Sequence, residues 1–231
     1  MHICGLQKLT LLDFPNHTAC TVFTGGCNYR CPFCQNSALV LHPETEPGIS
    51  EAEFFAFLEK RRGLLDGVAI TGGEPTLQPD LREFILNIRS MGFAVKLDTN
   101  GSRFSVLSAL IAEGLLDYVA MDIKNSPEFY VETVGVSDFR ADDVFQSVDL
   151  LLRGTVPYEF RTTIVEELHS VDAVADIAAW IRGASHYYLQ SFEDSGDILQ
   201  EGLHACTLDS LKSMLAAASI YVPSAELRGV E

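Results

Sequence analysis

The sequence is poor in basic residues and contains no long hydrophobic run. Its 16 lysines and arginines stand against 32 aspartates and glutamates, which gives a formal net charge of −16. Because phosphate backbones and anionic lipid surfaces repel a polyanion, this composition predicts a protein that binds neither nucleic acid nor a membrane. No apolar stretch reaches the roughly 20 residues of a membrane-spanning helix, and the N-terminus has none of the features of a signal peptide. We therefore expect a cytoplasmic protein.

Long linkers and low-complexity segments are also missing. A chain of 231 residues can bury a substantial core without a disulfide or a metal to staple it. We therefore predict a single domain over residues 1–231. It would consist of an N-terminal extension at 1–18, a core at 19–205, and a C-terminal helix and tail at 206–231.

Within this span, apolar runs rich in β-forming residues alternate with amphipathic stretches. The predicted strands cover 19–24, 67–71, 94–98, 118–123, 157–165 and 186–190, and the predicted helices cover 50–62, 80–91, 104–113, 141–153, 170–182 and 207–219. Repeated β-then-α units imply a parallel sheet with right-handed crossovers. A doubly wound open sheet and a barrel both fit, but polar residues gather where each strand ends, which favours one shared mouth. The expected fold is α/β, a partial (β/α)6 TIM-type barrel with parallel strands.

Three of the six cysteines fall within eight residues. Cys27, Cys31 and Cys34 form a C-x3-C-x2-C pattern in the loop after the first predicted strand. Such a cluster in a cytosolic chain indicates a metal-binding or catalytic site rather than a disulfide framework. Structural zinc sites and ordinary iron–sulfur clusters use four protein ligands. Three ligands with one vacancy describe a metal centre that can bind substrate.

The other three cysteines offer an alternative. Cys20 or Cys206 could supply a fourth ligand and make the centre structural. Free cysteines are usually buried core residues, and we expect that role for Cys4, Cys20 and Cys206.

The C-x3-C-x2-C pattern with Phe33 before its last cysteine resembles the radical S-adenosylmethionine superfamily. Residues 71–75 (TGGEP) resemble the GGE motif of that superfamily. Two further segments, 97–102 (LDTNGS) and 121–124 (MDIK), look like its glycyl-radical-enzyme activating branch. Residues 159–163 (EFRTT) and 227–230 (LRGV) are similar to activating proteins of anaerobic ribonucleoside-triphosphate reductase. The order and spacing of these segments make the resemblance specific over nearly the whole chain.

The resemblance implies an enzyme with a [4Fe-4S] cluster on Cys27, Cys31 and Cys34. In that family, S-adenosylmethionine chelates the fourth iron through its amino and carboxylate groups. One electron from the cluster breaks the sulfonium C–S bond, and the resulting 5′-deoxyadenosyl radical takes a hydrogen from a glycine of a partner enzyme. The implied partner is a glycyl radical enzyme, closest to anaerobic ribonucleotide reductase, and the implied electron donor is a flavodoxin or ferredoxin.

The resemblance also assigns cofactor-binding residues: Phe33, Asn36, Gly72, Gly73, Glu74, Asp98, Lys124 and Arg161. Phe33 would lie near the adenine of S-adenosylmethionine, and the two glycines would let the backbone approach that ligand. Glu74 would accept a hydrogen bond from the amino group of S-adenosylmethionine. Lys124 and Arg161 would contact its carboxylate or ribose, or else neutralise nearby aspartates. Asp98, Thr99 and Asp122 would bind a monovalent cation. The plainer alternatives are a strand-to-helix turn at the glycines, helix caps at the aspartates and a turn role for Asn36.

Three alternative functions stay open at this point. The chain could activate another glycyl radical enzyme, of the pyruvate formate-lyase type. It could be a compact small-molecule enzyme such as a 7-carboxy-7-deazaguanine synthase, although no pterin-binding residues are recognisable. It could also be a non-catalytic metal-binding protein, which would need a fourth ligand.

Overall fold

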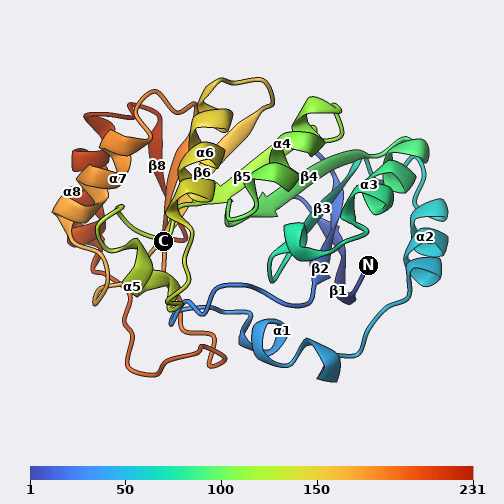
Figure 1. The fold of residues 1–231 in the computed structure, drawn as a ribbon, viewed down its shortest axis with the longest axis horizontal. Coiled ribbons are helices and arrows are strands. Elements are labelled where there is room, and N and C mark those ends of the chain that lie inside the picture. Colours follow the sequence, from blue (N-terminus) through green and yellow to red (C-terminus); the bar gives the residue numbers. More distant parts are fainter. Residues whose placement is uncertain (231) are drawn as a thin grey trace.

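A computed structural model describes residues 1–230 and places all of their strands in one curved sheet (Figure 1). The strands follow one another in chain order, from β1 at one edge to β8 at the other. β1 runs antiparallel to β2, and every later neighbouring pair is parallel. The strands are β1 (Ile3–Thr10), β2 (Ala19–Thr24), β3 (Gly67–Gly72), β4 (Ala94–Thr99), β5 (Tyr118–Asp122), β6 (Tyr158–Ile164), β7 (Tyr187–Ser191) and β8 (Ala225–Arg228).

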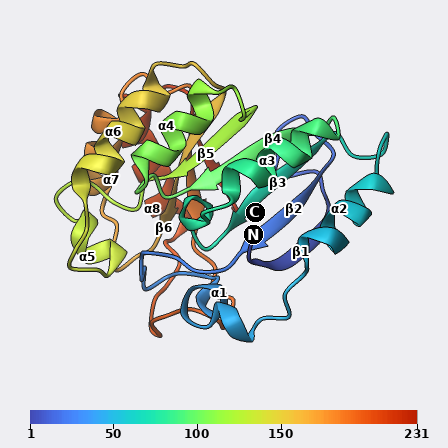
Figure 2. The same cartoon turned by 45° about the vertical axis from the view of Figure 1, so that its right-hand side comes forward.

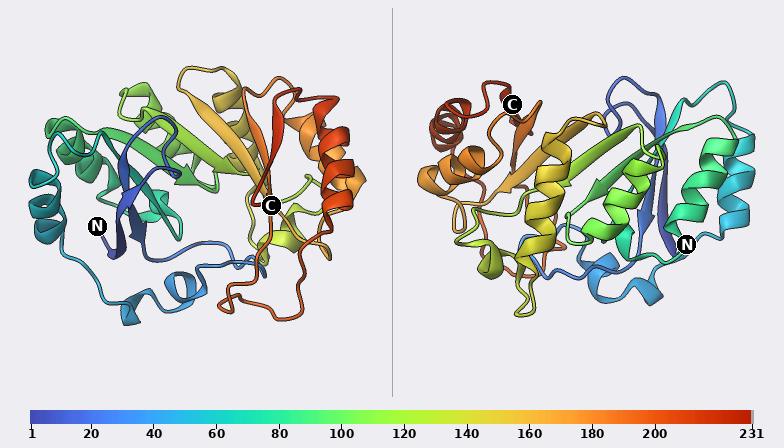
Figure 3. Two further views of the ribbon diagram at one scale, coloured as in Figure 1. Left: turned by 180° about the vertical axis from the view of Figure 1, so that it is seen from behind. Right: turned by 45° about the horizontal axis from the view of Figure 1, so that its top comes forward.

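Helices cover the outer face of this sheet, and its two edges do not pair, so the barrel stays open (Figure 3). The α-helices are α1 (Ser37–Leu41), α2 (Glu51–Glu59), α3 (Leu81–Ser90), α4 (Phe104–Ala112), α5 (Tyr130–Val134), α6 (Ala141–Leu152), α7 (Val171–Trp180) and α8 (Leu208–Ser219); short 3-10 helices lie at Pro43–Thr45 and Pro75–Leu77. None of the helices within residues 1–230 is long and apolar enough to cross a membrane.

The six predicted strands and six predicted helices are present with small shifts at their ends, and the partial barrel is confirmed. The predicted parallel strands of the core are confirmed, and the segment assigned to an N-terminal extension adds one antiparallel strand, β1. That strand is buried only near its two ends, so its sequence lacks the apolar pattern of the central strands. The predicted C-terminal tail likewise contains β8, whose four residues are too few to show a period.

Packing explains why the central strands are continuous apolar runs. Strands of a parallel sheet that is covered by helices are enclosed on both faces. Val68, Ala69 and Ile70 are accordingly inaccessible to solvent, although their side chains alternate between the two faces. On the outside, α3 turns Leu81, Phe84, Ile85 and Ile88 toward the sheet. Against this apolar background, polar side chains on these strands are exceptions, and they mark candidate functional residues in the barrel interior.

Two long connections cross the same end of the molecule. The segment between β2 and α1 carries the three clustered cysteines, and the segment between β7 and α8 lies beside it (Figure 2). The backbone N–H of Gln200 donates to the carbonyl oxygen of Pro32 over 3.0 Å, and the Gln35 amide donates to the carbonyl oxygen of Glu193 over 2.6 Å. The later loop thus supports the cysteine loop from outside.

Candidate functional site

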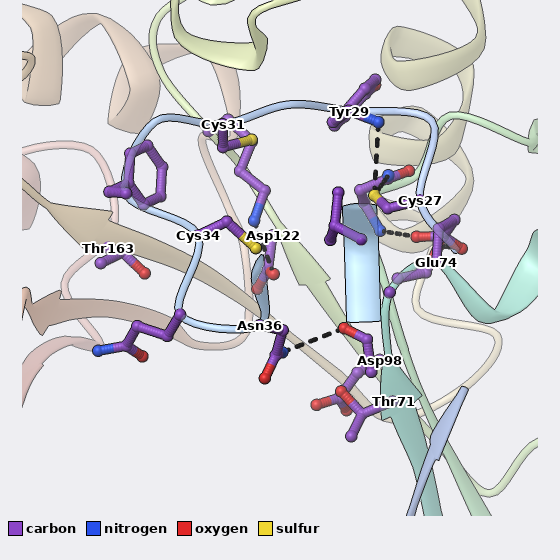
Figure 4. Close-up of a pocket in the computed structure, with 18 of the residues that line it drawn as sticks. Cys27, Tyr29, Cys31, Cys34, Asn36, Thr71, Glu74, Asp98, Asp122 and Thr163 are labelled. Atoms are coloured by element: carbon purple, nitrogen blue, oxygen red, sulfur yellow. Dashed lines mark hydrogen bonds and ion pairs between the residues drawn. The ribbon is translucent and has the colours of Figure 1, made fainter. Parts of the chain in front are cut away.

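A cavity of about 260 Å³ opens where the strands end, and all thirteen residues singled out in the sequence line it (Figure 4). These are the three cysteines, Phe33, Asn36, Gly72, Gly73, Glu74, Asp98, Thr99, Asp122, Lys124 and Arg161. Parallel strands place their carboxyl ends on one side of a sheet, so residues far apart in sequence meet there. The lining also includes residues to which the sequence reasoning gave no role, among them Tyr29, Asn100, Thr163 and Gln190.

The cysteine loop arches over one side of this cavity. The sulfur atoms of Cys31 and Cys34 turn toward the inside of the loop, facing the Cys27 limb (Figure 4). A hydrogen bond of 3.0 Å from the Cys34 N–H to the Cys31 carbonyl oxygen closes a tight turn between them. Arg30 fixes the middle of the loop, because its backbone N–H donates to the carbonyl oxygen of Val134 over 2.8 Å. The loop is therefore anchored to the rest of the protein between its first and second cysteines.

Burial favours the neutral thiol form of two cysteines in this loop, Cys27 and Cys31. It raises the pKa of Cys27 to about 12 and that of Cys31 to about 11, although Lys124 acts in the opposite direction on both. The thiolate is the form that ligates metal. Metal binding must therefore displace protons from these sulfur atoms.

The remaining cysteines lie outside the cavity. Cys4 and Cys20 are buried as predicted, but Cys206 is partly exposed beside the start of α8, so the expectation that it is a core residue is wrong. Within residues 1–230, no three His, Cys, Asp or Glu side chains gather closely enough to hold one metal ion. Iron–sulfur clusters are held by cysteine thiolates. The three cysteines of this loop line one cavity and supply that kind of donor.

Gly72 and Gly73 bring the end of β3 against the backbone that leads into the cysteine loop. Gly72 has a φ of 115°, and a Cβ atom on Gly73 would lie 2.0 Å from the carbonyl oxygen of Gly26. The backbone N–H groups of Gly73 and Glu74 donate to the carbonyl oxygens of Thr24 and Gly26, each over 2.8 Å. The glycines thus allow a close approach of two protein segments, and the predicted approach to a ligand stays a prediction. The contact between the two segments fixes where the cysteine loop leaves the sheet.

Glu74 uses its carboxylate within the protein. The side chain is 1% exposed. Oε1 accepts from the Thr76 N–H over 3.0 Å and from the Thr99 hydroxyl over 2.8 Å, and Oε2 accepts from the Asn100 N–H over 2.7 Å. Burial raises the pKa of Glu74, while these donors favour its charged form. The carboxylate joins the ends of β3 and β4, and the predicted contact with an amino group stays a prediction.

A chain of ion pairs crosses the interior of the barrel. The Arg161 guanidinium lies 3.0 Å from Asp98 Oδ2 and 2.9 Å from Asp122 Oδ1. The Lys124 ammonium lies 3.0 Å from the other oxygen of Asp122, and Lys96 pairs with Asp98. Burial alone would raise the pKa of each aspartate, but Arg161 and the neighbouring lysine outweigh it and lower both pKa values. Of the two predicted roles for Lys124 and Arg161, the structure shows the neutralisation of the aspartates.

These pairings leave the predicted monovalent cation site without a free carboxylate among the described residues. The Thr99 hydroxyl is also engaged, since it donates to Glu74 and accepts from the Gly101 N–H over 3.1 Å. A cation at Asp98, Thr99 and Asp122 would have to displace Arg161 or a lysine from its carboxylate. The cation site therefore stays a prediction.

The last two predicted residues connect the loop to its surroundings. The Asn36 side-chain amide donates to the carbonyl oxygen of Gly72 over 3.1 Å. The Phe33 ring is 4% exposed, and its centroid lies 6.3 Å from that of His169 and 6.0 Å from the Lys124 ammonium. Phe33 thus forms an apolar wall beside the partly buried Lys124 ammonium.

Comparison with known proteins gives a consistent result. Residues 21–178 match the family model of the radical SAM superfamily. A protein of Methanocaldococcus jannaschii named as a glycyl-radical enzyme activating enzyme is 30% identical over 234 residues, which covers 99% of this chain and 96% of that protein.

Two solved structures share the fold at low sequence identity. Streptococcus suis SuiB bound to its precursor peptide SuiA superposes with a TM-score of 0.71 at 12% identity, over 91% of this chain and 48% of that one. A domain of pyruvate-formate lyase-activating enzyme from Bacteroides vulgatus gives 0.57 at 16% identity, over 71% of this chain and 99% of that domain.

Proposed function

Because the chain belongs to the radical SAM superfamily, we propose that it installs a glycyl radical on a partner enzyme, anaerobic ribonucleoside-triphosphate reductase. Enzymes of this superfamily work with a [4Fe-4S] cluster and S-adenosylmethionine. The observation that carries the proposal is the cavity, which brings the three cysteines and the ring of strand-end residues around one space. The same proposal places the protein in the cytoplasm.

Cys27, Cys31 and Cys34 would hold the cluster. The cluster, when bound, supplies the electron that cleaves S-adenosylmethionine. The protein contributes a loop whose position is fixed by the close backbone contact between Gly73 and Gly26. It also contributes the Lys124 ammonium, whose charge favours the thiolate form of Cys31. Cys31 is itself buried, which keeps bulk water away from this ligand.

S-adenosylmethionine would occupy the cavity between this loop and the strand ends. Its zwitterionic head needs partners of both signs, and the Asp98, Asp122, Lys124 and Arg161 side chains supply them. Binding would exchange part of an existing ion-pair chain for contacts with the ligand. These four side chains are then all paired with one another or with Lys96 before the ligand arrives. We expect Phe33 to cover the adenine.

The choice of partner rests on two segments at the far side of the barrel. Residues 159–163 and 227–230 carry the resemblance to activating proteins of the anaerobic reductase, and the structure places them in contact. The two terminal nitrogens of Arg228 donate hydrogen bonds to the two carboxylate oxygens of Glu159, over 2.9 and 3.1 Å. The Arg228 guanidinium also lies 3.2 Å from the centroid of the Tyr188 ring. The two segments are therefore held together by direct side-chain contacts.

The proposed electron donor for the cluster is a flavodoxin or ferredoxin.

Electron paramagnetic resonance tests this function. Incubating the reduced, reconstituted protein with S-adenosylmethionine and the anaerobic reductase should give the doublet of a glycyl radical. The Cys31→Ala variant should lose both the cluster and the doublet. Cys206→Ala is the matched control and should keep both, because Cys206 lies outside the cavity.

Three results would argue against the assignment. Cleavage of S-adenosylmethionine without any doublet would exclude the reductase as partner. Turnover of a small molecule in the absence of a protein substrate would favour the synthase alternative. Loss of the cluster in Cys206→Ala would indicate a centre with four cysteine ligands.

A further inference from the structure

The three clustered cysteines do not have equivalent surroundings. Cys27 Sγ accepts two hydrogen bonds, from the Tyr29 N–H over 3.4 Å and from the Asn100 side-chain amide over 3.9 Å, which is long but suits the large sulfur atom. Among the described residues, neither Cys31 nor Cys34 has a hydrogen-bond donor on its sulfur. The Asn100 contact crosses from the end of β4 to the cysteine loop, so it is not a local feature of that loop.

The network around Asn100 fixes which end of its amide faces the sulfur. Asn100 Oδ1 accepts from the backbone N–H of Ser102 over 2.9 Å, and a backbone N–H can only donate. The nitrogen must therefore occupy the other position, where it also donates to Asn28 Oδ1 over 3.0 Å. Asn100 is 5% exposed, and its own N–H is held by Glu74. The side chain cannot turn away without breaking several bonds in a buried network.

We propose that Asn100 raises the reduction potential of the cluster through its N–H···S bond to Cys27. Hydrogen bonds to the ligating sulfurs are among the factors that set the potential of an iron–sulfur cluster. A donor on the thiolate stabilises the reduced cluster more than the oxidised one, because reduction adds negative charge. Asn100 is thus a positioning residue that acts on the cluster through its ligand Cys27. This inference rests on the proposed role of Cys27.

The test measures the midpoint potential of the reconstituted protein by a redox titration that electron paramagnetic resonance follows. Asn100→Asp keeps the oxygen that Ser102 requires and replaces the donor by a second oxygen. Asn100→Ala removes the donor without adding charge. Ser102→Ala is the matched control, because it removes the hydroxyl that accepts from Asn28 over 2.8 Å and leaves the bond to Cys27 in place.

Both Asn100 variants should have a more negative midpoint potential than the wild type. At a fixed applied potential, the ratio of reduced to oxidised cluster should fall by up to about tenfold, which for a one-electron couple corresponds to about 59 mV. Asn100→Asp should shift further than Asn100→Ala, and Ser102→Ala should keep the wild-type potential.

Unchanged potentials in the Asn100 variants would overturn the inference, as would an equal shift in Ser102→Ala. Loss of the cluster from both Asn100 variants would also overturn it, because Asn100 would then be needed for assembly rather than for tuning. A wild-type protein that takes up no four-iron cluster would instead refute the proposed function.

Discussion

Replacing Arg161 by methionine should destabilise the protein strongly at neutral pH. Arg161 is 14% exposed and bridges Asp98 and Asp122, whose side chains are 14% and 30% exposed. Methionine keeps much of the volume and removes the charge between the two carboxylates. Removing one partner of a buried ion pair typically costs about 3–5 kcal/mol, because the other charge is left uncompensated. Lys96 and Lys124 still face one aspartate each, so we expect a loss near the lower end, about 3 kcal/mol.

The pH dependence of this loss follows from the directions of the pKa shifts. In the wild type, both aspartates have lowered pKa values, so they contribute stability above the unfolded pKa of about 3.9 and lose it as the pH falls further. In the variant, burial and the proximity of the two carboxylates are offset by one lysine each, so both pKa values should be higher than in the wild type. The variant then carries a penalty at neutral pH that protonation relieves. The difference in unfolding free energy should therefore shrink as the pH falls from neutral through the pKa values of the variant.

Urea unfolding followed by circular dichroism measures this difference, with wild type and variant in the same metal state. Arg82→Met is a matched control, because Arg82 forms a bidentate pair with Glu113 in which both side chains are exposed. It should change stability little. A loss in Arg161→Met no larger than in the control would refute the reasoning, as would a loss that stays constant over this pH range.

Two further predictions concern the cysteine loop. Gly73→Ala should lower the unfolding free energy by more than about 2 kcal/mol and reduce cluster content, because its Cβ would meet the Gly26 carbonyl oxygen at 2.0 Å. Gly48→Ala is the control for urea unfolding, with its nearest atom at an ordinary 3.5 Å, and equal losses would contradict the clash. Cluster reconstitution, followed by visible absorbance, should be faster at about pH 9 than at about pH 7, because burial raises the pKa of Cys27 and Cys31 and a higher pH supplies more thiolate. Equal rates would mean that deprotonation does not limit assembly.

The sequence predicts structure best where a residue pattern has few possible explanations, as for buried apolar strands and clustered cysteines. Apolar runs predicted the six central strands, since strands enclosed on both faces must be apolar. The cysteine spacing and the motifs at strand ends predicted which residues meet in the cavity, because parallel strands end on one side of the sheet. The edge strands β1 and β8 were missed because they are partly exposed or short.

The sequence predicted that Lys124 and Arg161 could neutralise the aspartates, but it did not reveal the other polar pairings. Lys96 looked like part of an apolar strand, although a lysine two residues before Asp98 faces the same side of that strand and could have been recognised as its partner. Asn100 lay inside a recognised motif without a role, because its contact with Cys27 spans 73 positions. The glycines at 72 and 73 predicted a close backbone approach to a ligand, which stays a prediction, whereas the contact of Gly73 with Gly26 could be seen only in the fold.

Isotope transfer tests the central claim most directly. The partner reductase is prepared with glycine in which deuterium replaces both hydrogens on Cα. It is then incubated with the reduced protein and S-adenosylmethionine. If the protein abstracts hydrogen from a glycine, the 5′-deoxyadenosine formed should contain one deuterium, and no label should appear with Cys31→Ala. Unlabelled 5′-deoxyadenosine, formed at the same rate with and without the reductase, would contradict the account.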